Sequence, residues 1–169
     1  MLLPSLNAEL TLDPKGRVMV PRALRSTLEG EGFGSLVAFA NGGPRRGLAF
    51  YTVPDFKQLQ QDHASNNLLD PKARLFALAI NSTAQTVSID RAGRMLIPQQ
   101  LRNLLGLDRD LFLFTTGRWF EIWDRSRYGQ QAWPEASALW DELYGFGSLS
   151  LSAAASPATT PASPQVPTP

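Results

Sequence analysis

The chain has 169 residues, which is enough for one compact domain with a hydrophobic core but too few for two large domains. Its hydrophobic fraction of 43% is typical of a globular protein, and no apolar run approaches the roughly 18 residues that a membrane-spanning helix needs. The absence of cysteine excludes disulfides, thiol catalysis and cysteine-ligated metals. We therefore expect a cytoplasmic protein with no membrane partner.

The net charge is only +1, so any affinity for nucleic acid must come from how charge is distributed along the chain. Of the 16 basic residues 13 are arginine, whose planar guanidinium makes paired hydrogen bonds with phosphate or guanine. Residues 13–25 carry four bases and one acid, whereas residues 103–169 carry four bases and seven acids. The basic character is therefore concentrated near the N-terminus.

One short stretch of the sequence occurs twice. "LDPKGRVMVP" at 12–21 and "IDRAGRMLIP" at 89–98 have the same Asp, Gly, Arg and Pro, each pair 77 residues apart. Further on, "LVAF" at 36–39 matches "LFLF" at 111–114 with an offset of 75. Length changes in glycine-rich loops explain the drift, because surface loops tolerate insertions that strands and helices do not. The pattern predicts an internal duplication.

The elements of the first repeat follow in chain order. Alternating residues at 9–12 and the apolar "RVMV" after a glycine-containing turn predict a tight hairpin. Pro21 ends the second strand and suits the first turn of a short helix, "RALRSTL". A second hairpin from "LVAFA" to "LAFYT" follows, then a helix starting at Pro54, and "DPKARLFALAI" extends the helical region.

The second repeat predicts the same order of elements. A strand at 86–89 and "RMLI" form the hairpin, and the helix "QQLRNLLGL" after Pro98 is closed by Gly106. The strands "LFLFT" and "WFEIW" follow, with a last helix starting near Asp124 or Ser126. The four short strands of each half cannot bury their faces alone, so we expect the two halves to pack together. The expected fold is α+β, mainly β: one pseudo-two-fold β-barrel with flanking helices.

We expect three segments: a first repeat at 7–82, a second at 83–147 and a tail at 148–169. The tail has no charged and no aromatic residue, and five of its last 13 residues are proline. Such a composition cannot form a packed core, so the tail is predicted to be disordered.

Each repeated turn presents basic side chains. Lys15 and Arg17 occupy the first turn, and Arg91 and Arg94 occupy the second. The pseudo-symmetry is expected to bring both turns to one side of the barrel, where a cationic surface contacts phosphate by charge and guanine by bidentate hydrogen bonds. These residues could be ordinary solvated charge, but their repeated placement favours contact with double-stranded DNA.

Asp13 and Asp90, at equivalent turns, raise the alternative of a hydrolase with paired carboxylates. Such a pair needs both carboxylates within about 3 Å of each other in an apolar cleft. Each aspartate is instead followed four residues later by an arginine that would keep it ionised. Aspartate at the start of a β-turn accepts backbone N–H bonds, while Gly16 and Gly93 absorb unusual dihedral angles. We therefore expect a turn scaffold and no enzymatic activity.

No cofactor or metal is expected. The single histidine, His63, lies in the polar segment "FKQLQQDHASNN" and is predicted to be a solvated surface residue. One histidine without cysteine does not make a metal site. The sequence also lacks a glycine-rich phosphate loop, a nucleophile elbow and a paired-histidine metal helix.

The doubled motif carries a family resemblance. The pattern written as "DPKGRVMVPRALR" and again as "DRAGRMLIPQQLR", together with "FEIWD" at 120–124, resembles the MraZ family of bacterial transcription regulators. The likeness covers roughly residues 7–130. It implies an AbrB-like swapped-hairpin β-barrel with both halves in one chain.

The resemblance also implies a function: sequence-specific DNA binding that regulates the operon for cell division and cell wall synthesis. The implied target is a set of short G-rich direct repeats, and the implied assembly is a nucleoid-associated ring of subunits. By position, Lys15, Arg17 and Arg94 fall on the family's DNA-contacting residues. Arg25 and Arg102 could be structural partners of the aspartates or further DNA contacts. An AbrB-like antitoxin that binds a toxin and its own promoter remains an alternative.

Overall fold

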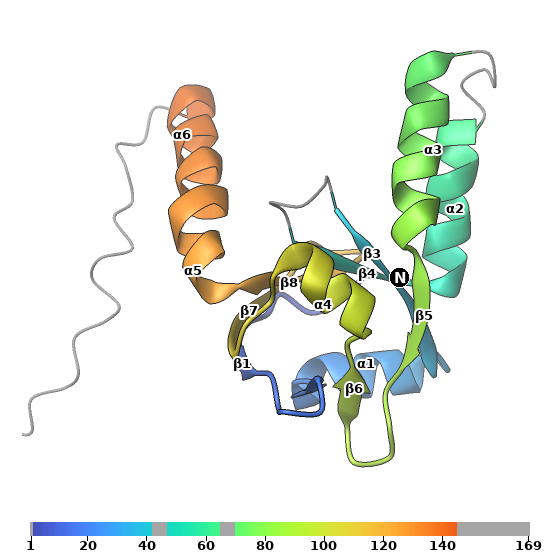
Figure 1. Ribbon diagram of the computed structural model, residues 1–169, viewed down its shortest axis with the longest axis vertical. Coiled ribbons are helices and arrows are strands. Elements are labelled where there is room, and N and C mark those ends of the chain that lie inside the picture. The colour runs from blue at the N-terminus through green and yellow to red at the C-terminus, as the bar shows by residue number, and fades with distance from the viewer. Residues whose placement is uncertain (1, 42–46, 65–69, 145–169) are drawn as a thin grey trace, which may run out of the picture. The chain divides into compact units, whose positions relative to one another are not determined.

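A computed structural model describes residues 2–41, 47–64 and 70–144 (Figure 1). The chain divides into two compact units, Met1–Trp133 and Pro134–Pro169. All strands and helices α1 to α5 belong to the first unit, whereas helix α6, Trp133–Tyr144, lies almost entirely in the second. The tail predicted at 148–169 lies outside the described residues.

The predicted elements are present in the predicted order. The first half contributes β1 (Asn7–Thr11), β2 (Arg17–Met19), α1 (Arg22–Gly30), β3 (Ser35–Ala40), β4 (Leu48–Thr52), α2 (Val53–Ala64) and α3 (Pro71–Thr83). The second half contributes β5 (Gln85–Ser88), β6 (Arg94–Leu96), α4 (Gln99–Leu105), β7 (Asp110–Thr115), β8 (Phe120–Asp124), α5 (Arg125–Arg127) and a π-helical turn (Tyr128–Ala132).

Helices α1 and α4 are equivalent in sequence and in packing. Leu24 and Leu28 of α1 are buried, as are Leu101 and Leu105 of α4, and the four-residue spacing places each pair on one face of its helix. Gly106 adopts the left-handed conformation, with φ of 53°, after the last turn of α4. The predicted glycine cap of this helix is therefore confirmed.

The strands form a mostly antiparallel arrangement of two sheets. The six-stranded sheet has the order β1-β7-β8-β4-β3-β5, and β2 pairs with β6 in a separate two-stranded ribbon. Exchanging each strand with its equivalent in the other half, β1 with β5, β3 with β7 and β4 with β8, gives the same order read from the opposite edge of the sheet. The larger sheet ends at β1 and β5 and does not close, so the strand pairing differs from the closed barrel predicted from the sequence.

The first hairpin predicted in each repeat is wrong in its pairing, whereas the second hairpin, β3 with β4 and β7 with β8, is confirmed. Strand β1 pairs with β7 and not with β2, while β2 pairs with β6. Strand β5 pairs with β3, and among the described residues an isolated bridge joins Ile89, just after β5, to Met95 of β6. Alternation along a strand marks the strand but does not identify its partner, and here the partners come from the other half of the chain. The two halves are therefore intertwined.

The described residues form two hydrophobic clusters. The larger contains residues of both halves, and the rings of Phe50 and Phe120 stack in it with centroids 4.6 Å apart. The smaller lies under the helix pair α2–α3, which run side by side in Figure 1, and includes Phe39, Phe56 and Ile80. Because the larger core includes residues of β2, β6, α1 and α4, it fixes the ribbon against the large sheet.

Candidate nucleic-acid interface

The ribbon formed by β2 and β6 brings two of the predicted site residues to one face. Its register places Arg17 opposite Leu96, Val18 opposite Met95 and Met19 opposite Arg94. The central pair points into the core, so the flanking residues point outward. Arg17 and Arg94 are therefore diagonal neighbours on the outward face, a relation that corresponds to roughly 7–8 Å in an antiparallel pair.

The first turn is held by the carboxylate of Asp13. Its Oδ1 accepts hydrogen bonds from the backbone N–H groups of Lys15 at 2.8 Å and Arg17 at 2.9 Å. Its Oδ2 accepts from Arg17 Nε at 2.9 Å and lies 2.8 Å from Arg17 Nη2. Gly16 has a φ of 80°, a conformation that side chains with a Cβ rarely adopt. One aspartate thus fixes both the turn backbone and the arginine side chain.

The second turn has the same construction around Asp90. Its Oδ1 accepts from the backbone N–H groups of Ala92 and Arg94, each at 2.9 Å, and its Oδ2 accepts from Arg94 Nε at 3.0 Å. Gly93 also has a φ of 80°. In Figure 1 this turn precedes β6 and lies far from the helix pair α2–α3.

The electrostatics of the two aspartates oppose the hydrolase alternative. The backbone hydrogen bond from Arg17, supported by its side chain, lowers the pKa of Asp13 below the ordinary 3.8. The backbone hydrogen bond from Arg94 likewise lowers the pKa of Asp90. A pair of carboxylates that share a proton needs one raised pKa, so these aspartates have the properties of turn scaffolds.

Arg25 and Arg102 each lie against the turn of the opposite half. A methyl group added at Gly16 would lie 2.5 Å from Arg102 Cζ, and one added at Gly93 would meet the guanidinium of Arg25. Arg102 Nε also donates to the carbonyl oxygen of Ile97 at 3.0 Å. Sequence reasoning placed both arginines on equivalent helices but had no signal for this exchange between halves.

The cations of the turns are accessible to a ligand. Lys15 and Arg91 are exposed, and the side chains of Arg17 and Arg94 retain 29% and 40% exposure despite their aspartate partners. Each guanidinium therefore keeps free N–H donors while the aspartate limits its motion. The arrangement suits an anionic, hydrogen-bond-accepting surface.

The same ribbon face also exposes Met19 and Leu96, which sequence reasoning did not single out. Met19 is 54% exposed and Leu96 is 53% exposed. The signal was present in the alternation of "RVMV" and "RMLI", because Val18 and Met95 point inward and their neighbours must point outward.

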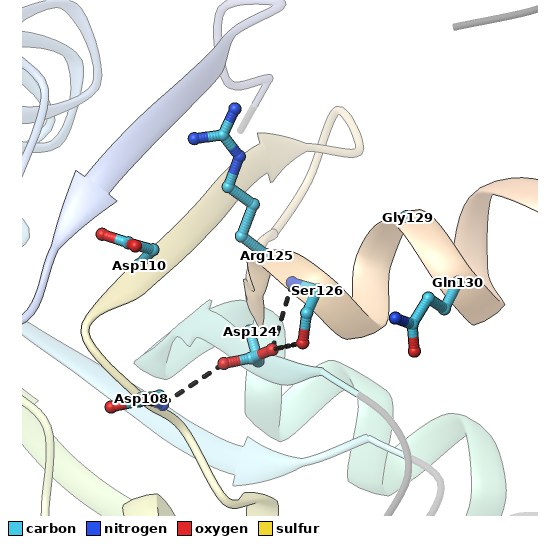
Figure 2. A pocket seen from close by; sticks show the side chains of 7 residues that line it. All are labelled: Asp108, Asp110, Asp124, Arg125, Ser126, Gly129 and Gln130. Atoms are coloured by element: carbon cyan, nitrogen blue, oxygen red, sulfur yellow. Dashed lines mark hydrogen bonds between the residues drawn. The ribbon is translucent and has the colours of Figure 1, made fainter. Parts of the chain in front are cut away.

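A surface pocket of about 440 Å³ lies elsewhere, at the start of α5 (Figure 2). Its lining residues are Asp108, Asp110, Asp124, Arg125, Ser126, Gly129 and Gln130. Burial alone would raise the pKa of Asp124, but hydrogen bonds from the Ser126 hydroxyl and nearby backbone N–H groups lower it. Asp124 accepts from the backbone N–H groups of Ser126 and Arg127, so it caps a helix. None of the predicted site residues lines this pocket.

The described part of the chain shows neither a cluster of metal-ligand side chains nor a membrane-crossing helix. Within residues 2–41, 47–64 and 70–144, no group of three or more histidine, aspartate or glutamate side chains is arranged to hold a metal ion. No helix in these ranges is long and apolar enough to cross a membrane. His63 belongs to α2, but its side chain lies outside the described part.

Comparisons with known proteins agree with the sequence motif. A family model described as "MraZ protein, putative antitoxin-like" matches residues 80–138. The protein named transcriptional regulator MraZ from Dechloromonas aromatica is 35% identical over 145 residues, which cover 85% of this chain and 97% of the relative. The protein of the same name from Methylobacillus flagellatus is 31% identical over 141 residues, covering 81% of this chain and 94% of the relative.

A third relative of that name, from Thiobacillus denitrificans, is 30% identical over 143 residues, covering 82% of this chain and 95% of the relative. All three names describe regulators of transcription and not enzymes. The resemblance noted in the doubled motif is confirmed. The chain belongs to the MraZ family of transcriptional regulators.

Proposed function

We propose that this protein binds specific sequences of double-stranded DNA through the outward face of the β2–β6 ribbon and the two turns beside it. The observation that carries the proposal is the position of Arg17 and Arg94 on one face, each oriented by its own aspartate. A two-stranded ribbon fits the major groove, which is about 12 Å wide. The guanidinium groups would bind guanine edges, and Lys15 and Arg91 would bind phosphates.

The two halves, 7–82 and 83–147, are proposed to be the repeats of an AbrB-like swapped-hairpin fold. The matched turns and the strand order that survives exchange of the halves support this proposal. The β2–β6 ribbon contains one strand from each half, so a single chain would supply a complete two-fold DNA-contacting face.

Family membership supports a finer proposal for the target: G-rich direct repeats upstream of the division and cell wall operon. One chain offers few phosphate contacts, so its binding would be weak and salt-sensitive. A nucleoid-associated ring of subunits would engage successive repeats by effective concentration, with repeats about 10 bp apart facing the same side. Helix α3 exposes Leu75 at 64% and Leu78 at 63%, which supports self-association.

Footprinting on the DNA upstream of the protein's own gene tests the proposal. We expect the wild type to protect a defined region and Arg17→Ala and Arg94→Ala each to lose that protection. Arg118→Ala is the matched control, because Arg118 is 61% exposed and lies outside the ribbon. Unchanged protection by both ribbon variants would remove the proposal.

A second candidate function is that of an antitoxin, favoured by the antitoxin-like description of the matching family model. An antitoxin would bind a small toxin protein as well as its own promoter. Purification of the tagged chain from its native host distinguishes the two candidates, because an antitoxin would carry a stoichiometric small partner. Specific promoter binding by the chain without such a partner would favour the regulator.

A further inference from the structure

Met19 and Leu96 form an apolar pair that the fold does not require. They occupy equivalent positions in the two halves, and each is slightly more than half exposed, at 54% and 53%. Their neighbours Val18 and Met95, at 1% and 0% exposure, supply the ribbon's contribution to the core. The outward positions could therefore carry polar residues at little cost to stability.

These apolar side chains stand among the cations of the proposed DNA-binding face. Leu96 lies directly opposite Arg17, and Met19 lies directly opposite Arg94. The four outward residues thus alternate between guanidinium and apolar groups, related by a local two-fold axis between Val18 and Met95. Recognition of guanine edges explains the arginines but gives no role to two large apolar side chains at the centre of the face.

We propose that Met19 and Leu96 are specificity-determining residues that contact the 5-methyl groups of thymines in the major groove. This inference rests on the proposed function, since it takes the ribbon face as the DNA-binding surface. Among the groups displayed in the major groove the thymine methyl is the apolar one, and apolar side chains contact it in other protein–DNA interfaces. Contact with it would remove both side chains from water.

The ribbon geometry defines the kind of site that this face would recognise. Each apolar residue lies beside an arginine on the opposite strand, so a thymine contact would be adjacent to a guanine contact. The hydrogen bonds from Arg17 to Asp13 and from Arg94 to Asp90 hold the guanidinium groups in place before binding, which reduces the ordering cost. The face would therefore favour guanine next to an A·T pair over guanine in a pure G·C run.

Replacement of single thymines by uracil tests this inference, because uracil pairs identically and lacks only the methyl group. The full-length protein is titrated against its footprinted upstream duplex and against duplexes with one thymine replaced at a time. We expect replacement of a contacted thymine to weaken wild-type binding roughly fourfold, as for one buried CH₂ group. Met19→Ala and Leu96→Ala should each weaken binding to the unmodified duplex and lose sensitivity at their own thymine.

Leu104→Ala provides the matched control, because Leu104 is 41% exposed and lies on α4, outside the ribbon. It should bind like the wild type and keep full sensitivity to uracil. Thermal unfolding should be unchanged in Met19→Ala and Leu96→Ala, so lost binding cannot be attributed to lost folding.

Three outcomes overturn the inference. If the wild type binds the footprinted duplex and no uracil replacement weakens that binding, the methyl contact is refuted and the proposed function stays intact. If Met19→Ala and Leu96→Ala both keep the wild-type sensitivity to uracil, the methyl contact is made by other residues. A lower oligomer mass in Met19→Ala or Leu96→Ala would make this face a contact between copies. Failure of the wild type to bind upstream DNA at all would instead refute the proposed function.

Discussion

The guanidinium of Arg102 lies against Gly16, although the two residues belong to different halves of the sequence. Arg25 has the same relation to Gly93. Each turn is therefore hydrogen-bonded by the aspartate of its own half and packed against a helix arginine of the other half. The stability of each turn should depend on both halves of the chain.

Replacing Gly16 with alanine should destabilise the protein for two reasons. The φ of 80° disfavours a residue with a Cβ, at a cost of about 1–2 kcal/mol, and the new methyl group would displace Arg102. Urea denaturation measures the loss in the free energy of unfolding. Gly30→Ala is the control: nothing lies within 4 Å of a methyl group there, so it should be neutral or slightly stabilising. Equal stability of both variants would contradict the proposed crowding.

The lowered pKa values of Asp13 and Asp90 predict a specific acid sensitivity. A folded-state pKa below 3.8 means that the ionised carboxylate stabilises the fold above about pH 3.8, and that this contribution is lost as pH falls through the folded-state pKa. We expect Asp13→Asn to melt below the wild type at pH 7 and the two melting temperatures to converge in strong acid. Asp90→Asn should behave alike, because its turn has the same hydrogen bonds; a constant difference at every pH would contradict this account.

Glu121 should stabilise the fold although it is an acidic residue buried in strand β8. Its side chain is buried at 6% exposure and accepts hydrogen bonds from Asn41 Nδ2 at 2.9 Å, Trp119 Nε1 at 3.1 Å and Trp123 Nε1 at 2.8 Å. Glu121→Ala leaves these donors without an acceptor, so we expect a loss of about 1–3 kcal/mol in the free energy of unfolding by chemical denaturation.

Glu9→Ala is the matched control for Glu121. It removes a carboxylate whose side chain is 64% exposed and paired with Arg125, so it should change the unfolding free energy by less than about 1 kcal/mol. A loss in Glu9→Ala as large as that in Glu121→Ala would show that burial and hydrogen bonding do not account for the role of Glu121.

The sequence predicted the elements of this fold much better than their partners. Local signals such as the glycine cap after Leu105 depend on neighbouring residues and are readable in one dimension. The pairing of β2 with β6 joins residues about 77 apart. The strand of its own half and the strand of the other half that could pair with β2 have the same alternating pattern, so the pattern does not choose between them. The duplication itself made the prediction ambiguous, because a strand that fits its own half fits the other half equally well.

The candidate site was predictable in residue type but not in arrangement. Asp13 and Arg17 are four residues apart, so their contact in the turn follows from local geometry. The contact of Arg102 with Gly16 and the shared outward face of Met19 and Leu96 depend on the exchange of strands between halves. Because the sequence pattern does not identify the partner of each strand, it also does not predict which residues of the two halves come into contact.

The exposed face of α3 predicts a surface for self-association. Leu75 and Leu78 are separated by one helical turn and are both more than 60% exposed. We expect Leu75→Lys and Leu78→Lys to lower the molar mass measured by light scattering without lowering the melting temperature. Leu104→Lys, on α4, should keep the wild-type mass. Wild-type mass in both α3 variants would exclude this face as a contact between copies.

Lys15 and Arg17 should contribute differently to DNA binding at the proposed interface. Lys15 is exposed at the tip of the turn and is proposed to neutralise a phosphate, so Lys15→Ala should reduce the slope of log K against log salt by about 0.9 without changing sequence preference. Arg17 lies on the outward face of the ribbon and donates a hydrogen bond to Asp13. Arg17→Ala should therefore cost about 1–3 kcal/mol of discrimination between the footprinted duplex and an unrelated one.

Binding titrations of both variants at several salt concentrations separate these two effects. Arg118→Ala, which removes an exposed arginine outside the ribbon, should change neither the slope nor the discrimination. The same loss of discrimination in Lys15→Ala and Arg17→Ala would contradict the division of roles, because a phosphate contact strengthens binding to every sequence equally. A reduced salt slope in Arg17→Ala with unchanged discrimination would place its guanidinium on the phosphate backbone and not on a base.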